Sequence, residues 1–444
     1  MRKVVRIGAA ATLAVALFVG GGIGLFRSIA DGSASGPPVA APTADTLLAP
    51  VLGGSLERTI ENLQTRLRTL PTDWRSFASL GLAYVQQARL SGDPSYYPKA
   101  EGVLQTSMDL HEQDNFEAMV GMAALSAARH DFADALAWGR KARAIDPYNG
   151  NVYGVIGDAE VELGSYDDAF RTFQRMVDTL PGVASYARVS YARELKGDIS
   201  GAIAAMEAAR DIAGTPADAA WASYQLGELH FGQGNLSASR EAFRRGTRMD
   251  SNFVPSFAGL AKVAWAQGDL DRAIAGYADV VARYPLPEYV IALGDLYEAT
   301  GRPEDAAQQY ALVQVEAQLF RSNGVNVDLE LALFDADHGN PRAARRAARD
   351  EWERRQSVHV ADAYAWALYA NGDFRHAEAI SRKAMAIGYR NALFAFHAGM
   401  IQLRLGDQAG ARRFLTEALS INPHFSIRWA PIAAERLAML DGAA

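Results

Sequence analysis

Residues 150–183 have the sequence GNVYGVIGDAEVELGSYDDAFRTFQRMVDTLPGV. Apolar and small residues fall at positions 4, 7, 8, 20, 24 and 27 of this stretch, which are the spacings of one face on each of two helices. These residues are Tyr153, Ile156, Gly157, Ala169, Phe173 and Met176. Gly164 lies between the two patterns and Pro181 follows the second, and these residue types end helices. The stretch therefore predicts two amphipathic helices joined by a tight turn.

The same pattern recurs along the chain with a period of about 34 residues. From Val254 the matching residues are Phe257, Leu260, Ala261, Gly268, Ala273, Tyr277, Val280 and Pro285. From Ala392 they are Ala395, Ala398, Gly399, Gly406, Ala411, Leu415, Ala418 and Pro423. The units resemble the tetratricopeptide repeat, a helix–turn–helix module. About ten of them start near residues 74, 116, 150, 183, 220, 254, 287, 325, 358 and 392.

No single unit can bury its apolar face alone, so neighbouring units must stack. The resemblance implies an all-α fold, a right-handed α-solenoid that spans residues 74–425. Residues 56–73 have the pattern of a second helix without its first, and residues 426–444 have that of a first helix without its second. We expect each of these segments to form a capping helix that shields the last apolar face from water.

The N-terminal segment, residues 1–26, is predicted to be a transmembrane anchor or a signal sequence. Arg2, Lys3 and Arg6 precede an uncharged stretch over residues 7–26, about 20 residues that would span ~30 Å as a helix. The basic flank places the rest of the chain on the extracytoplasmic side of the cytoplasmic membrane, or outside the cell if the segment is cleaved. Residues 27–55 are rich in Ala, Ser, Gly and Pro and predict a flexible linker.

Composition and motifs argue against several function classes. The formal net charge of −7 is unlike the basic surface that nucleic-acid binding needs. The chain has no cysteine, which excludes thiolate metal sites and cysteine nucleophiles. Phosphate-binding loops, nucleophile elbows and the HExxH metalloprotease motif are absent from the sequence. We expect no catalysis, no cofactor and no metal, because the eight histidines fall at unrelated positions of the units.

The concave groove of the solenoid is the predicted functional surface. In proteins with this repeat the first helices line that groove, and positions 2, 5, 9 and 12 of each unit point into it. Aromatic residues at these positions would anchor a partner, and carboxylates would favour a basic segment with Arg or Lys. Alternatively, the aromatic residues fill the contacts between adjacent first helices. The candidate residues are Asp158, Tyr191, Glu194, Trp221, Tyr224, Glu228, Phe231, Lys262, Trp265, Asp295, Glu298, Trp366 and Tyr369.

These features predict a non-catalytic scaffold or adaptor that binds a partner protein in its groove. A membrane tether through residues 7–26, or export, would place this scaffold outside the cytoplasm. Two alternatives stay open at the level of sequence. The chain could bind a polysaccharide or small ligand by stacking aromatic rings on it, or it could serve as an accessory subunit of a membrane transport or biogenesis complex.

Overall fold

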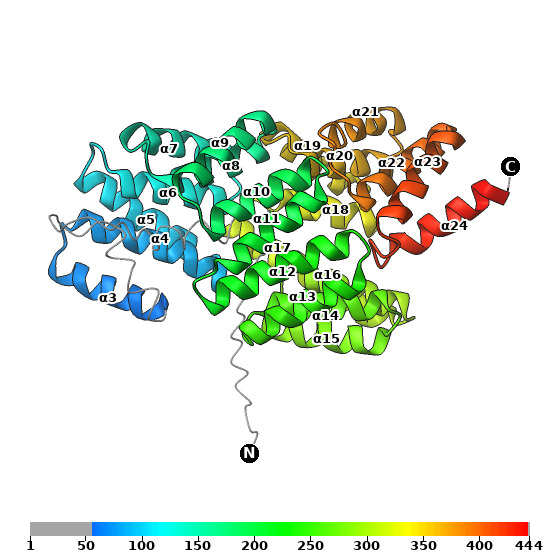
Figure 1. Ribbon diagram of the computed structural model, residues 1–444, viewed down its shortest axis with the longest axis horizontal. Helices are drawn as coiled ribbons and strands as arrows, with labels where there is room; N and C mark the ends of the chain where they lie inside the picture. The colour runs from blue at the N-terminus through cyan, green and yellow to red at the C-terminus, as the bar shows by residue number, and fades with distance from the viewer. Residues whose placement is uncertain (1–55, 443–444) are drawn as a thin grey trace, which may run out of the picture.

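The computed structural model describes residues 56–442, and within them the chain is all α-helix without strands (Figure 1). Helices α4 to α23 form ten consecutive pairs, flanked by α3 (Leu56–Thr69) and α24 (Trp429–Gly442). The first five pairs are α4 (Trp74–Ser91) with α5 (Tyr96–Leu110), α6 (Phe116–Ala128) with α7 (Phe132–Ile145), α8 (Gly150–Glu162) with α9 (Tyr166–Thr179), α10 (Val183–Leu195) with α11 (Ile199–Asp211), and α12 (Pro216–Gly232) with α13 (Leu236–Met249).

The second five pairs continue the series with the same alternation. They are α14 (Val254–Ala266) with α15 (Leu270–Arg283), α16 (Pro287–Ala299) with α17 (Pro303–Ser322), α18 (Asp328–Asp337) with α19 (Pro341–Arg354), α20 (Val358–Ala370) with α21 (Phe374–Ala384), and α22 (Ala392–Leu405) with α23 (Gln408–Ile421). The predicted fold class is confirmed: an all-α solenoid of about ten helix–turn–helix repeats with a helix at each end.

The turn inside each pair depends on a residue with left-handed backbone. Gly164 and Gly268 take φ values of +79° and +81° there, a conformation that residues with a Cβ rarely adopt. In several pairs the following Asp or Asn caps the second helix, as Asp198 does by accepting from the backbone N–H of Gly201 at 2.9 Å. In the second pair His130 occupies the glycine position with φ 63°. Sequence patterns over only a few residues thus determine each hairpin.

Small residues let neighbouring helices approach each other closely. Gly227 of α12 and Gly259 of α14 both lie against the ring of Phe243, a side chain of α13 that is fully buried. A Cβ built at either glycine would overlap that ring. Because buried rings in close-packed cores have no room to move, the two glycines define how near α12 and α14 lie to α13.

We expect Gly227→Ala to lower the free energy of unfolding by about 1–3 kcal/mol, because the new methyl group overpacks the core against Phe243. Urea unfolding followed by circular dichroism measures the change. Gly232→Ala is the matched control, since it lies at the end of the same helix and its Cβ would meet no atom within 4 Å. Equal stability of the two variants would show that Gly227 is not a packing position.

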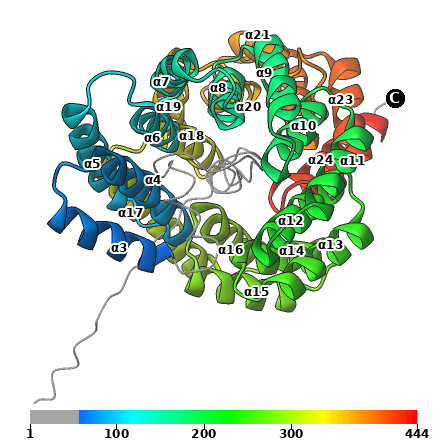
Figure 2. The same cartoon turned by 60° about the vertical axis from the view of Figure 1, so that its left-hand side comes forward.

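The solenoid coils far enough for its successive turns to touch. Figure 2 shows the helix pairs arranged as a ring, and hydrogen bonds join residues 191 to 196 positions apart. The Tyr166 hydroxyl accepts from the backbone N–H of Val358 at 2.6 Å, and the Asn422 side-chain amide donates to the carbonyl of Phe231 at 2.9 Å. We call this line of contacts between turns the seam.

A buried group of charged side chains lies on the seam. Arg355, which is 4% exposed, forms ion pairs with Glu162 of α8 and Glu351 of α19. The side-chain amide of Asn326 donates to Glu351 at 2.7 Å, and Arg354 binds the same carboxylate at 2.6 Å. Arg355 therefore connects two parts of the chain that sequence places far apart, and both of its carboxylate partners are almost fully buried.

A membrane-spanning helix was predicted near the N-terminus. None of the helices within residues 56–442 combines the length and the apolar character needed to cross a membrane. The predicted anchor or signal, residues 1–26, and the predicted linker, residues 27–55, lie outside the described residues, as do residues 443–444. The anchor and the linker therefore stay predictions.

Candidate binding surface on the inner wall

The first helix of each pair lies toward the inside of the ring. Figure 2 shows α12 and α16 on the inside, with α13 and α15 farther out. We call the inward surface of the even-numbered helices α4 to α22 the inner wall. All of the sequence-predicted groove residues belong to these helices. Their exposure now separates those that hold the wall together from those that a partner could reach.

Four of the predicted aromatic residues are buried in the isolated chain. Trp221 and Trp366 are each 3% exposed, Tyr191 is 8% exposed and Phe231 is 6% exposed. Trp221 packs in the core formed by α10, α11 and α12. The indole N–H of Trp366 donates a hydrogen bond to the Asp337 carboxylate at 2.6 Å. Of the two alternatives that the sequence left open, burial favours packing between helices for these four side chains.

The remaining aromatic candidates are half-buried. Trp265 lies edge-on to His424, with ring centroids 6.4 Å apart, and also contacts Phe231. Tyr224 packs between Phe243 and Phe253, with centroid distances of 5.8 and 5.9 Å. Tyr369 stacks on Trp366. Each of these rings keeps some accessible surface, so these three are the aromatic side chains that an incoming segment could contact.

Four carboxylates from well-separated helices influence one another on the inner wall. Burial raises the pKa values of Glu194, Glu288 and Glu330 to about 7. The Glu228 carboxylate contributes to the raised pKa of both Glu194 and Glu288, and Glu330 contributes to that of Glu288. Charges influence one another in this way only over short distances. We call these four residues the inner carboxylate cluster.

Few cations balance the inner carboxylate cluster. Lys262 donates to both oxygens of Glu228, at 2.9 and 2.6 Å, and its ammonium lies 5.2 Å from the centre of the Phe231 ring. Lys262 also lowers the pKa of Glu288 and Arg355 lowers that of Glu330, but within residues 56–442 no ion pair involves Glu194, Glu288 or Glu330. The Tyr389 hydroxyl hydrogen-bonds to Glu194. The cluster therefore has more carboxylates than cations.

The other predicted carboxylates have different surroundings. Asp158 forms a two-pronged ion pair with Arg188, with distances of 2.9 and 2.6 Å, and Arg188 is fully buried. Asp158 is therefore a structural residue of the wall. Asp295 and Glu298 lie near Tyr310 and His338 rather than near the cluster. Of the carboxylates predicted from sequence, only Glu194 and Glu228 belong to the cluster.

Sequence reasoning missed one cluster member, Glu330. Glu288 stands at position 2 of its unit, a groove position that the repeat pattern selects, although it is not among the candidate residues given above. Glu330 falls at position 6 when the unit starts at residue 325, which is not a groove position. Helix α18 begins later, at Asp328. That displacement changes which side chains the helix presents to the wall.

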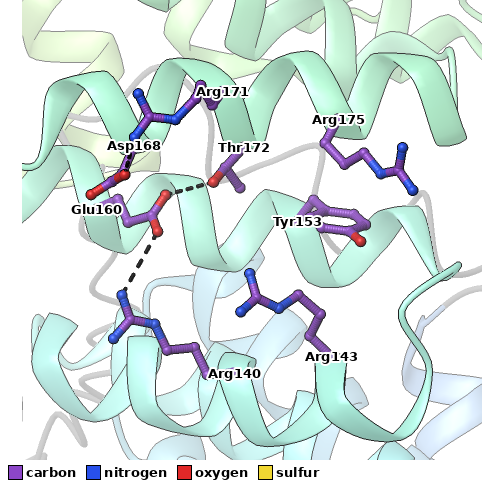
Figure 3. A pocket seen from close by; sticks show the side chains of 8 residues that line it. All are labelled: Arg140, Arg143, Tyr153, Glu160, Asp168, Arg171, Thr172 and Arg175. Atoms are coloured by element: carbon purple, nitrogen blue, oxygen red, sulfur yellow. Dashed lines mark hydrogen bonds and ion pairs between the residues drawn. The ribbon is translucent and has the colours of Figure 1, made fainter.

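A second concave feature lies between α7, α8 and α9. Figure 3 shows this cleft of about 420 Å³, and four of its eight lining side chains are arginines. Its floor includes Glu160, which accepts from Thr172 at 2.7 Å and lies 4.0 Å from Arg140. The lining residues are Arg140, Arg143, Tyr153, Glu160, Asp168, Arg171, Thr172 and Arg175. The cleft carries a net positive charge, opposite to that of the inner carboxylate cluster.

Comparison with known families identifies the repeat. Two profiles described as tetratricopeptide repeat match the chain, one over residues 186–252 and 259–318 and the other over residues 394–425. The chain therefore contains tetratricopeptide repeats, and its fold is the solenoid that such repeats build. Scaffolds of this fold are typical of adaptors in protein–protein interactions. No curated protein matches the chain.

Solved structures of similar shape come from several proteins. The APC/C hetero-tetramer Cut9-Hcn1 is 17% identical over 89% of this chain and 76% of that one, with a TM-score of 0.40. Human IFIT1 is 11% identical over 91% of this chain and 95% of its own, with a TM-score of 0.47. Yeast Tom70 is 12% identical over 90% and 94% of the two chains, with a TM-score of 0.34.

Proposed function

We propose that the chain is a non-catalytic scaffold that binds a partner protein on its inner wall, through a partner segment that carries Arg or Lys. The observation that carries this proposal is the inner carboxylate cluster, in which Lys262 pairs with Glu228 and no ion pair within residues 56–442 involves the other three carboxylates. Half-buried Trp265 of α14 and Tyr369 of α20 belong to the wall and offer aromatic surface to such a segment.

The electrostatics of the cluster support a basic partner. Partial burial makes the charged form of each carboxyl unfavourable, which is why the pKa values of Glu194 and Glu288 rise to about 7. A guanidinium or ammonium group from a partner would stabilise that charged form by hydrogen bonds that water no longer supplies. Such charge-assisted bonds contribute about 1.5–3 kcal/mol each, and they favour cationic segments over neutral ones.

The location of the scaffold is also part of the proposal. The basic flank and the apolar stretch in residues 1–26 support an anchor or an export signal, and residues 27–55 would then separate the solenoid from the membrane. Protease treatment of intact cells or spheroplasts tests this placement. Digestion of the solenoid before lysis supports an extracytoplasmic location, and full protection would contradict it.

The binding of a basic peptide to the inner wall should depend on pH. We expect the affinity for a nona-arginine peptide to increase between pH 6 and pH 8. Glu194 and Glu288 are neutral below a pH of about 7 and carry a charge above it. In the double variant Glu194→Gln/Glu288→Gln this pH dependence should become weaker, because Glu330 is then the one remaining cluster carboxyl with a pKa of about 7. Binding at pH 8 should weaken by at least about tenfold, the equivalent of 1.4 kcal/mol. Fluorescence anisotropy measures both effects.

The matched control is Glu241→Gln/Glu304→Gln, which removes two exposed carboxylates from the second helices α13 and α17. At pH 8 it has the same change in net charge, so long-range attraction then falls equally in both variants. Crosslinked capture from solubilised membranes then compares the natural chain with the two variants. A partner retained by the cluster variant, or a control variant that binds as weakly as the cluster variant, would contradict the proposed site.

A further inference from the structure

Three side chains of metal-binding type converge where α16 meets the end of α18. Asp295 and Glu298 lie one helical turn apart on α16, and His338 caps the C-terminus of α18. One ligand atom from each of the three lies within 4.8 Å of those from the other two. Asp295 and His338 are mostly buried, with 15% and 9% of their side chains exposed, whereas Glu298 is 48% exposed.

The orientation of the His338 ring is determined by its surroundings. Its Nδ1 lies 2.8 Å from the carbonyl oxygen of Phe334, and a carbonyl can only accept, so Nδ1 carries a hydrogen. The rings of Tyr310 and Phe334 pack against the imidazole, with centroid distances of 4.3 and 4.4 Å. Nε2 then faces the Oδ1 of Asp295 at 3.1 Å.

This arrangement places two acceptors opposite each other when the imidazole is neutral. The Nε2 lone pair faces a carboxylate oxygen, and that oxygen already lies 2.8 Å from the Tyr310 hydroxyl. A positive centre must therefore lie near Nε2, either a proton on the ring or a metal ion bound by the ring and the carboxylates. Glu298 brings a third ligand atom within 4.8 Å of the other two, and a metal ion, unlike a proton, can bind all three at once.

We propose that His338 Nε2 and the carboxylates of Asp295 and Glu298 bind a divalent transition-metal ion such as Zn²⁺. One imidazole and two carboxylates are a ligand set that suits this class of ion, and the half-exposed side of Glu298 leaves room for water as a further ligand. A metal-bound histidine usually donates its other N–H to a carbonyl or carboxylate, as His338 does to Phe334.

Neighbouring groups position the two carboxylates. The Tyr310 hydroxyl lies 2.8 Å from Asp295 Oδ1 and 3.0 Å from Glu298 Oε2. Arg428, from the segment before α24, donates to Glu298 Oε2 at 2.7 Å and leaves the other oxygen of Glu298 available to the metal ion. An ion here would join α16 to α18 and, through Arg428, to the C-terminal end of the solenoid. None of its ligands belongs to the inner carboxylate cluster, so the site is independent of the proposed function.

Titration of the chelator-treated full chain with Zn²⁺ in a calorimeter tests the proposal. We expect one site that His338→Gln or Asp295→Asn weakens by more than about 100-fold, because losing a ligand has a larger effect than the 10–100-fold typical of residues that only orient ligands. Tyr310→Phe should fall in that smaller range. The control is His376→Gln, which changes an exposed histidine that also pairs with an aspartate, Asp373, at 2.8 Å.

Each other outcome overturns the proposal. If Zn²⁺ does not bind, the positive centre is a proton and His338 forms a simple ion pair with Asp295. If Zn²⁺ binds equally to the natural chain and to the His338→Gln variant, the metal lies elsewhere. Equal affinity for Ca²⁺, which prefers oxygen ligands, would exclude a role for the imidazole. Glu298→Gln changes a proposed ligand in a variant that should still fold, because the Glu298 side chain is half-exposed. Weaker Zn²⁺ binding in this variant could therefore not be attributed to loss of folding.

Discussion

The Arg355→Ala variant is expected to lose about 3–5 kcal/mol of stability, among the largest effects of any single substitution in the solenoid. Arg355 is 4% exposed, and its guanidinium pairs with Glu162 and Glu351, which are 3% and 1% exposed. Removing it leaves the buried Glu162 carboxylate without its cation and leaves Glu351 paired with Arg354 alone, and the uncompensated charge makes the folded state less favourable. Urea unfolding monitored by circular dichroism measures the loss.

Two further variants separate the buried charge from the seam itself. Arg349→Ala removes an arginine that is 54% exposed and pairs with Asp350, so its effect should stay below about 1 kcal/mol. The triple variant Glu162→Gln/Glu351→Gln/Arg355→Met removes all three charges at once. It should recover most of the stability, because replacing a whole buried ion group by neutral residues is often close to neutral. A loss below 1 kcal/mol in Arg355→Ala would contradict the buried ion pairs.

The repeats could be predicted from sequence because the information is local. Apolar residues at helical spacing, glycine at the turn and proline after the second helix all act within one unit, as in residues 150–183. Helix ends were less predictable. Thr215 accepts from the N–H of Asp218 and Pro216 occupies the first turn, so α12 begins four residues before the unit start predicted at residue 220.

The seam could not be predicted from one sequence. Its contacts join residues 191 to 196 positions apart, and they depend on how a small rotation at each helix pair accumulates around the ring. His130 illustrates the difficulty. In sequence it is a histidine where most units have glycine, whereas in the structure its Nδ1 lies 2.7 Å from the carbonyl oxygen of Asn326, across the seam.

The candidate site was predictable in its location but only partly in its residues. Unit positions identify which side chains point away from the repeat's own core, and that reasoning selected Glu194 and Glu228. Unit positions do not tell which other segments cover those side chains. The C-terminal segment supplies Trp429 over Trp366 and His424 beside Trp265, so two predicted surface tryptophans are partly or wholly covered by residues that lie far along the chain.

Trp366→Ala should lower the free energy of unfolding by about 3–5 kcal/mol, the range for removing a large aromatic side chain from a core. Its indole ring stacks on His397 and Tyr369, with centroid distances of 4.1 and 4.6 Å, and meets Trp429 edge-on at 5.4 Å. The substitution also leaves the Asp337 carboxylate without the indole N–H that donates to it. Burial already raises the pKa of Asp337, so losing this donor adds to the loss of packing.

Two companion variants decide whether Trp366 is a core residue or a binding anchor. Trp366→Phe keeps an aromatic ring in the stack but loses the bond to Asp337, so it should cost about 1–3 kcal/mol, less than alanine. Trp265→Ala removes a half-buried ring and should have a smaller effect on stability while weakening nona-arginine binding. If Trp366→Ala instead unfolds like the natural chain and loses only binding, the ring contacts a partner rather than the core. The stacking on His397 and the hydrogen bond to Asp337 argue for the core, because both contacts are complete without any partner.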